Sequence, residues 1–437
     1  MPGDPNGFDV RPSRPRWLTA VLVAVVTLAS TGFAHLFRAS ARWVVGCYAS
    51  TGDPTIAAGT LARPVAIAVA VGTVLVAATV GRYVERRWRH RVGIEAVAAS
   101  ARGEQRRISI RATVARTLAT WVASAGLVSI GRESAIIESG GAFGATIGRR
   151  TGGKGDTLAA TGIVAAFAAA YHAPVAAVLY AGEHLGVDRS RRAVTFVVLS
   201  AGGAYAASRW WFHADPVFPG VHGSRWSMVA LGLVGVVPAA LAARGFLVVR
   251  LRASRGGLGA HRRAAVASTT VALALAAGAA IAVFPLAAGN GMEAIRHGST
   301  QAGWTLAIAL LVGKLVGTAA ALGAGTPGGV LSPTMGVAAG AALAATMAGQ
   351  HFPGIRWGLS GWAPWSLIVM AMAVGVAVGL RSPLVAVFLV PEMLGDYSLV
   401  PAVAVVVAVA VVIDRGLDAA ARRMGSLLPT GVYDEDA

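Results

Sequence analysis

Charged residues and cysteine are both scarce in this 437-residue chain. Only 13% of the residues are charged, whereas a typical soluble domain carries nearer a quarter. The single cysteine, Cys47, excludes an internal disulfide and any metal site built from cysteines. No stretch interleaves aromatic with basic residues in the way that favours base stacking, so we expect no nucleic-acid partner despite the net charge of +18.

Long apolar blocks take the place of charge. Hydrophobic residues make up 55% of the chain, and residues 17–37 and 64–81 contain no Asp, Glu, Lys or Arg. Each block is close to the roughly 20 residues that cross a bilayer as a helix. The pattern predicts an all-α polytopic membrane protein in contact with a lipid bilayer. Further apolar blocks lie at about 112–130, 157–181, 193–207, 227–243, 264–292, 303–323, 330–350, 366–380 and 397–413.

The first apolar block has a second interpretation, as a signal peptide. It is long for that role and lacks a clear Ala-x-Ala cleavage pattern, so we expect it to be retained as a helix. We expect residues 1–16 to form a basic cytoplasmic tail, residues 17–424 the transmembrane domain, and residues 425–437 a C-terminal tail. Because the chain ends soon after the last apolar block, we expect no sizeable soluble domain there.

Basic residues gather between the apolar blocks. Arginines cluster in residues 82–116, 189–192, 250–263 and 415–423. Cytoplasmic loops of membrane proteins carry this excess of Lys and Arg, which also suits a surface facing anionic lipid. The distribution therefore predicts that residues 82–116 and 250–263 face the cytoplasm.

One pattern occurs twice in the chain. Residues 172–183 and 381–392 share Pro at the third position, Ala-Val at the sixth and seventh, and Glu at the twelfth. Proline is well placed in the first turn of a helix. A Gly-rich passage that interrupts apolar sequence precedes each copy, at residues 131–141 and 325–333. The repeat predicts two halves, at about 17–215 and 226–413, each with broken helices.

Repeated broken helices indicate a transport site near the membrane midplane. The alternative is that the small residues only permit close helix packing. A helix that starts at a break points its free N–H groups and its positive dipole end into the gap, which favours an anion. The acids in apolar surroundings are few: mainly Glu133, Glu138, Glu183, Glu293 and Glu392.

These motifs together resemble the CLC family of chloride channels and chloride/proton antiporters. Gly131-Arg132-Glu133 is similar to the family's GREGP motif, and Gly328 to Pro333 resembles GGxFxP. Residues 172–183 and 381–397 resemble the two Pro-started helices, and residues 91–95 occupy the place of GSGIP. The order and spacing match over roughly residues 17–424. The likeness is to a divergent bacterial-type member without C-terminal CBS domains.

The resemblance implies a CLC-like fold with two inverted-topology repeats and broken, tilted helices. It also implies a homodimer with one anion pathway per subunit, carrying chloride or a similar small anion as substrate, without a cofactor or metal. It implies a multi-pass location in the cell inner membrane or plasma membrane. Channels and transporters of this kind are not enzymes.

The same resemblance supplies a set of site residues. It places the gate at Glu133, whose carboxylate occupies an anion site when ionised and leaves when protonated or displaced. The alternative is that Glu133 is a loop acid paired with Arg132. By position, anion-binding groups would be Val92, Gly93, Ile94, Ser134, Val330 and Leu331, most of them through backbone amides. The alternative for residues 91–95 and 328–333 is a pair of plain turns.

The sequence departs from the family at the expected anion site. Val92 stands where the family has serine, and Leu331 where it has phenylalanine. Ser134 and Ala135 replace the last two residues of GREGP. The family's central tyrosine is absent, and its nearest counterpart is Asp418, which we interpret as a surface residue of a C-terminal helix rather than as a site residue.

A further departure bears on proton coupling. His184 follows Glu183 where antiporters of the family have a second glutamate that relays the proton. Histidine can carry protons, so Glu133 and His184 form a candidate proton pathway, and a helix-capping histidine is the alternative. Antiport and passive anion conduction both remain open, as does a non-conducting membrane scaffold or sensor. A membrane enzyme would need a polar constellation that the apolar blocks lack.

Overall fold

The computed structural model describes residues 15–88, 91–102, 108–151, 156–186, 190–221, 224–258, 263–350 and 363–423. Residues 1–14 of the predicted N-terminal tail (1–16) and the whole predicted C-terminal tail (425–437) lie outside these ranges, and Arg16 of the predicted tail is already the first residue of helix α1. Within them the chain is helical. The elements are α1 (Arg16–Ala49), α2 (Pro54–Thr60), α3 (Arg63–Trp88), α4 (Ile94–Ala101), α5 (Ile110–Ala125), α6 (Glu133–Arg150), α7 (Asp156–Tyr171), α8 (Pro174–His184), α9 (Arg191–Trp210), α10 (Arg225–Leu258), α11 (Arg263–Val283), η1 (Pro285–Ala287), α12 (Met292–His297), α13 (Trp304–Ile308), η2 (Ala309–Gly313), α14 (Lys314–Gly323), α15 (Leu331–Gly349), α16 (Pro364–Gly379), α17 (Pro383–Leu394), η3 (Tyr397–Leu399) and α18 (Val400–Arg423).

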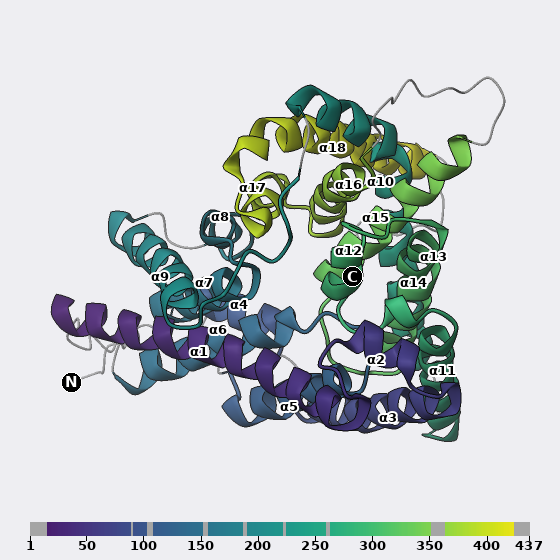
Figure 1. The fold of residues 1–437 in the computed structure, drawn as a ribbon. Helices are drawn as coiled ribbons and strands as arrows, with labels where there is room; N and C mark the ends of the chain where they lie inside the picture. Colours follow the sequence, from purple (N-terminus) through teal and green to yellow (C-terminus); the bar gives the residue numbers. More distant parts are fainter. Residues whose placement is uncertain are drawn as a thin grey trace.

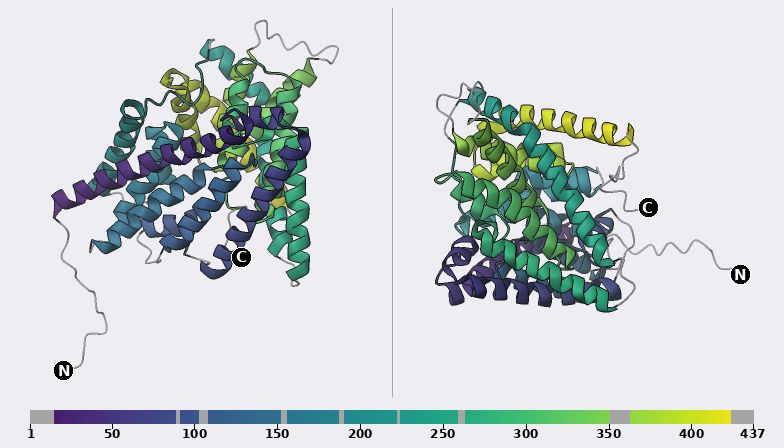
Figure 2. Two further views of the ribbon diagram at one scale, coloured as in Figure 1. Left: turned by 60° about the horizontal axis from the view of Figure 1, so that its bottom comes forward. Right: turned by 90° about the vertical axis from the view of Figure 1, so that its right-hand side faces the viewer.

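Seven helical segments in the described ranges are long and apolar enough to cross a membrane. They confirm the prediction of a polytopic all-α membrane fold, which Figure 1 shows in full. Shorter apolar helices such as α16 and α17 lie between them. Several helices run obliquely to one another, as α1 does across α6 and α7 in Figure 2. The seven segments are Arg16–Thr60, Arg63–Trp88, Trp226–Ala253, Ala265–Val283, Trp304–Gly323, Leu331–Gly349 and Tyr397–Ala420.

The predicted repeat is visible in the backbone. Gly93 and Gly291 have φ angles of 96° and 102°, and each is the N-cap of a short helix, α4 or α12, with an acid in its first turn. Gly325 (φ 100°) follows Gly291 at the same sequence distance as Leu127 (φ 65°) follows Gly93. The two halves therefore break their helices in the same order, which confirms the repeat.

The Pro-started helices α8 and α17 match as well. His172 and Arg381, each two residues before the proline, have φ angles of 55° and 53°. Such positive φ values are uncommon for residues other than glycine. The two helices pack against each other, so the corresponding parts of the two halves meet in the interior.

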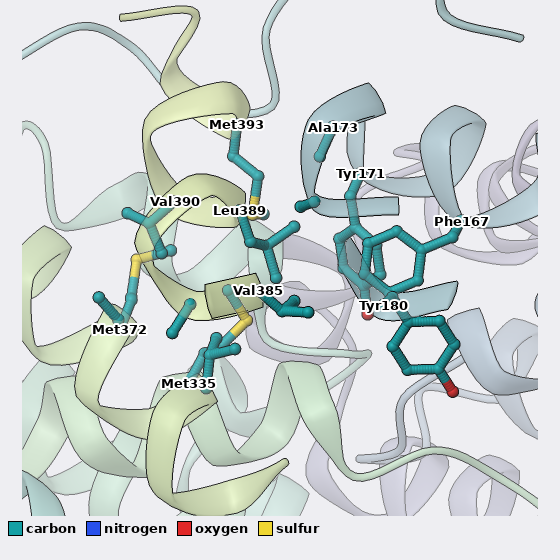
Figure 3. Close-up of a cluster of buried hydrophobic side chains, with 14 of the residues drawn as sticks. Phe167, Tyr171, Ala173, Tyr180, Met335, Met372, Val385, Leu389, Val390 and Met393 are labelled. Carbon is teal, nitrogen blue, oxygen red and sulfur yellow. The ribbon is translucent and has the colours of Figure 1, made fainter. Parts of the chain in front are cut away.

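Helix α16 forms the centre of the core. Every residue from Trp365 to Gly379 is buried, and a helix that is apolar on all sides belongs in the interior. Figure 3 shows how the halves join beside it: Phe167, Tyr171 and Tyr180 of the first half face Val385 and Leu389 of α17.

The two basic segments begin on the same side of the molecule. Arg82 donates to the carbonyls of Ala324 (2.8 Å) and Gly323 (3.4 Å) at the end of α14. A Cβ on Gly323 would lie 2.8 Å from the Cβ of Ala253 near the end of α10. Because both helices approach Gly323 of α14, the ends of α3 and α10 lie on the same side of the molecule, which agrees with a common cytoplasmic location. That this side faces the cytoplasm stays a prediction.

Candidate functional site

The two Gly-rich breaks meet at one point. Gly131 and Gly329 form an isolated antiparallel bridge, in which the Gly131 N–H donates to the Gly329 carbonyl at 2.9 Å and the Gly329 N–H to the Gly131 carbonyl at 2.6 Å. A Cβ on Gly131 would lie 2.6 Å from the Gly329 oxygen, so the approach requires glycine. Helices α6 and α15 start two residues beyond the bridge, and their N-termini therefore lie side by side.

Glu133 is the first residue of α6, and its carboxylate is buried, with 6% of the residue exposed. The Ser332 hydroxyl donates to Oε2 at 2.9 Å, and the Asn290 side-chain amide donates to Oε1. The Arg132 guanidinium lies 3.8 Å from Oε1. A buried carboxylate needs such partners, and two of the three come from the second half of the chain.

A tyrosine hydroxyl extends this set. Tyr171, at the end of α7, is buried, and its hydroxyl lies 3.4 Å from the Ser332 hydroxyl. In Figure 3 the ring of Tyr171 lies among the apolar side chains around α17. Tyr171, Ser332 and Glu133 thus form a buried chain of hydroxyl and carboxyl groups. The tyrosine hydroxyl of α7 therefore lies within reach of the polar group around Glu133.

A second carboxylate lies on the other side of Arg132. Oε1 of Glu293, in α12, accepts from Arg132 at 2.8 Å and from Arg42 at 3.3 Å. Burial alone would raise the pKa of Glu293, but the two guanidinium groups lower it to about 2. A carboxyl with a depressed pKa stabilises the fold above its ordinary pKa of 4.5 and loses that contribution as the pH falls toward 2. Glu293 therefore stays ionised at neutral pH.

An open cleft of about 870 Å³ reaches this carboxylate. Glu293 lines it together with Arg42, Asp53, Arg296 and His297. Oε2 of Glu293 is buried without a hydrogen-bond partner in the described residues. The chain Arg42, Glu293, Arg132 and Glu133 thus connects the cleft with the break at α6.

The remaining expected anion-binding residues separate into two groups. Val330 is the N-cap of α15, Leu331 its first residue, and Ser134 the second residue of α6, so their amides lie among the free N–H groups of helix starts. Gly93 is different, because its N–H donates to Oε1 of Glu138 at 2.9 Å. An anion near Val92, Gly93 and Ile94 would have to compete with that carboxylate, which Arg116 also contacts at 3.4 Å.

His184 is the last residue of α8, and its ring nitrogen Nε2 is hydrogen-bonded to the hydroxyl of Ser382, the N-cap of α17. Its ring lies 4.9 Å from that of Tyr180, which stacks on Phe167. Phe167 in turn lies 4.9 Å from Tyr171. A row of rings therefore joins His184 to the group around Glu133, although apolar Phe167 interrupts the polar chain.

The two repeat-ending glutamates cap each other's helices. Glu392 accepts from the N–H groups of Val175 (2.9 Å) and Ala176 (2.8 Å) at the start of α8. Glu183 accepts from Leu384 (3.3 Å) and Val385 (3.5 Å) at the start of α17. Both acids are thereby explained as structural partners of helix N-termini.

Asp418 is not a free surface residue. It pairs with Arg244 at 2.5 Å and with Arg381 at 3.1 Å. Its two ion pairs join α18 to α10 and to the start of α17. Asp418 therefore has structural partners of its own and is not part of the group around Glu133. In the described part of the chain, no group of three His, Cys, Asp or Glu residues could hold a metal.

Sequence reasoning missed three residues around Glu133: Asn290, Ser332 and Lys314. Lys314 was inside an apolar block, where a lone ionisable residue is itself a sign of function. Asn290 lies between two glycines directly before the acid-bearing helix α12, which is the same arrangement as a break. Ser332 belongs to the GGxFxP-like passage, in which the sequence indicates only backbone amides as anion donors, whereas the structure shows its hydroxyl donating to Glu133.

A helical membrane protein whose two inverted halves bring helix N-termini and a buried carboxylate together is an ion-transport protein of the broken-helix class. The chain belongs to the voltage gated chloride channel family, whose model matches residues 72–415.

Known relatives agree with this assignment. The voltage-gated ClC-type chloride channel ClcB of Salmonella typhimurium is 26% identical over 319 residues, which are 70% of this chain and 74% of that protein. A slow cyanobacterial Cl−/H+ antiporter has a similar fold, with a TM-score of 0.72, 20% identity, and coverage of 93% of this chain and 95% of that one. A CLC-type fluoride/proton antiporter gives a TM-score of 0.70 at 18% identity, covering 92% of this chain and 98% of that one.

Proposed function

We propose that this protein transports chloride or a similar small anion across a membrane through one pathway in each subunit, with Glu133 as the gate. The observation that carries the proposal is the setting of the Glu133 carboxylate. It is buried at the joint start of α6 and α15, and it is held by the neutral donors Ser332 and Asn290.

Those donors would bind an anion as readily as a carboxylate. When the Glu133 side chain leaves, the Ser332 hydroxyl, the Asn290 amide and the helix-start N–H groups of Val330, Leu331 and Ser134 lose their anionic partner. A buried donor without an acceptor is costly, and a small anion can replace the carboxylate oxygens. Arg132 adds positive charge at the same place. Protonation of Glu133 removes the charge that competes with the anion.

Proton coupling is a second part of the proposal. Relatives with this fold include a Cl−/H+ antiporter and a fluoride/proton antiporter, whereas ClcB is named as a channel. We assign His184 to the inner end of a proton pathway because the ring row from Tyr171 through Phe167 and Tyr180 ends there. Because Phe167 cannot carry a proton, water between the rings has to complete this pathway.

The surroundings of the site complete the proposal. We expect a homodimer in the cell inner membrane or plasma membrane, with no cofactor and no enzymatic activity. Residues 17–424 form the transport domain, and the halves have limits near residues 17–215 and 226–413.

Glu133→Gln tests the gate. Glutamine cannot carry the negative charge, so it imitates the protonated, open carboxyl group. In liposomes that carry either chloride or fluoride, we expect anion flux with weak pH dependence and no proton movement against a gradient. The wild type, measured beside it, should show flux that rises as the pH falls.

The same experiment can contradict the proposal in two ways. If Glu133→Gln leaves flux, pH dependence and proton movement unchanged while the wild type is pH-sensitive, Glu133 is only a structural partner of Arg132. If purified, folded wild type conducts no anion at any pH, the protein is a membrane scaffold or sensor instead of a transporter.

A further inference from the structure

Lys314 is a buried ionisable residue that the proposed gate does not use. It is the first residue of α14, directly after the π-helical segment η2, and none of its surface is exposed. An ionisable residue inside a membrane domain is costly and marks function. Single π-helical turns within α-helices are also frequent at functional sites. Two independent features therefore coincide at this residue.

The partners of Lys314 are backbone carbonyls. Its ammonium group donates to the oxygen of Ala287 at 2.9 Å and to that of Gly289 at 2.5 Å. Both carbonyls belong to residues 287–291, which we call the strap and which run from the last residue of η1 to the residue before α12. The ammonium group therefore holds the strap rather than a carboxylate.

The strap is confined on both sides. Gly289 and Gly291 have φ angles of 67° and 102°, where L side chains rarely fit. A Cβ on Gly289 would lie 2.7 Å from Pro54 Cγ, and a Cβ on Gly291 would lie 2.8 Å from Lys314 Cε. The strap thus passes between α2 and the lysine side chain, and its position depends on both.

Asn290 lies at the middle of the strap and is itself buried. Its Oδ1 accepts from the N–H of Met292 at 3.1 Å, which fixes the orientation of the amide. Its Nδ2 donates to Oε1 of Glu133. One residue of the strap therefore connects Lys314 to the gate carboxylate.

The groups that face Glu133 can be named element by element. Arg132 precedes it, and the others are Arg38 of α1, Tyr171 of α7, Glu293 of α12 and Lys314 of α14. Arg38 donates to the carbonyls of Ala169 and Ala170, and Arg132 pairs with Glu293. Lys314 is distinguished from these cations because it holds the segment that donates to Glu133.

We propose that Lys314 is a positioning residue for the gate: it holds the strap so that Asn290 retains the Glu133 carboxylate in the closed position. This inference rests on the proposed role of Glu133. Without the ammonium group, the strap carbonyls lose their donor, the strap shifts, and Asn290 loses its contact. The closed state is then weakened, and protonation opens the gate at a higher pH.

The test is anion flux from chloride-loaded liposomes as a function of pH. The variants are Lys314→Met, Asn290→Ala, the double variant and Glu133→Gln. Methionine matches lysine in length without charge or donors. We expect Lys314→Met to raise the pH of half-maximal flux by about one unit. Asn290→Ala should give a similar shift, and the double variant a shift no larger than the greater single one, because the two residues act through one contact.

Three other results of this flux measurement would overturn either the inference about Lys314 or the proposed function. If Lys314→Met lowers total flux but leaves the midpoint unchanged, the lysine is only structural and the inference is wrong. Additive shifts in the double variant would also overturn it. If Glu133→Gln keeps the wild-type pH dependence, the gate itself is misassigned, and the proposed function fails first.

A second variant covers the case in which Lys314→Met does not fold. Gly291→Ala keeps the lysine but places a Cβ 2.8 Å from Lys314 Cε at a backbone φ of 102°, so the strap and the lysine side chain have to move apart. The midpoint should rise in Gly291→Ala as it does in Asn290→Ala. Unchanged midpoints in both of these variants would overturn the inference without any measurement on Lys314→Met.

Discussion

The break before α6 and the break before α15 share a backbone but differ in chemistry. Gly131 and Gly329 bridge each other, and each is followed by a helix start. The next two residues are Arg132 and Glu133 in one half, and Val330 and Leu331 in the other. The first half therefore supplies the Glu133 carboxylate, which we propose as the gate, whereas the second half supplies the neutral donors that hold it.

The short helices that precede these breaks differ in the same way. Gly93 of the first half gives its N–H to the internal carboxylate of Glu138. Gly291 of the second half ends the strap that carries Asn290 to Glu133. A repeated backbone can therefore hold a single buried carboxylate between its two copies when their side chains differ.

The largest difference between the halves is expected in the free energy of unfolding when the two capping glutamates, Glu392 at the start of α8 and Glu183 at the start of α17, are replaced. Glu392 has short bonds to α8 and accepts from the Tyr397 hydroxyl at 2.6 Å, whereas the bonds of Glu183 are long and its side chain is exposed. Glu392→Gln should destabilise the fold by about 2 kcal/mol, and Glu183→Gln by less than about 1 kcal/mol. Thermal unfolding in detergent measures both, and equal losses would show that the caps are equivalent.

Ser134 and Ser332 occupy equivalent positions, because each lies three residues after the bridging glycine of its break. Ser332 donates to Glu133, whereas Ser134 contributes its backbone. Ser332→Ala should raise the pH of half-maximal flux by about one unit, which corresponds to about 1.4 kcal/mol. Ser134→Ala is the matched control and should leave the midpoint within about 0.3 units. The assignment of the donors to the second half would be wrong if Ser134→Ala gave the larger shift.

A smaller effect is expected at Tyr171. Its hydroxyl contacts Ser332 at 3.4 Å and reaches Glu133 only through that serine. Tyr171→Phe should therefore shift the midpoint by about a third of the Ser332→Ala shift. Flux in chloride-loaded liposomes checks this, and a shift as large as that of Ser332→Ala would mean that the tyrosine acts on Glu133 directly.

The smallest effect on anion flux is expected at His184, which is bonded to Ser382 and lies at the far end of the ring row. His184→Ala should leave the rate and pH midpoint of anion flux close to those of the wild type. Proton movement recorded in the same liposomes should fall if the protein is an antiporter. A large loss of anion flux with normal folding would contradict its assignment to the proton pathway alone.

Much of the fold follows from residues that sequence reasoning can interpret. The Pro-started copies at residues 172–183 and 381–392 predicted α8 and α17, and the Gly-rich passages predicted the breaks. These features are local, since proline and glycine restrict or free the backbone at their own positions. The prediction of two halves needed only the order of these glycine-rich passages and Pro-started helices along the chain.

The partners of Glu133 could not be predicted in this way. Asn290 and Lys314 are far from Glu133 in sequence, and their contacts depend on how α12 and α14 pack against the first half. Gly93 likewise resembled an anion donor until Glu138 was placed beside it. Asp418 was expected at the surface, but its ion pairs with Arg244 and Arg381 depend on α10 and α17.

The hydrogen bond between Ser332 and Glu133 spans 199 residues of sequence, and this separation has a consequence for biosynthesis. Ribosomes add about 5–20 residues each second, so Glu133 waits roughly 10–40 seconds before Ser332 exists. During that interval Arg132 and Arg38 are charged neighbours that have already been made, and Asn290 arrives only shortly before Ser332. The hydrogen-bonded surroundings of Glu133 can therefore be completed only after 199 further residues have been translated, so the first half is made before the neutral donors of its own carboxylate.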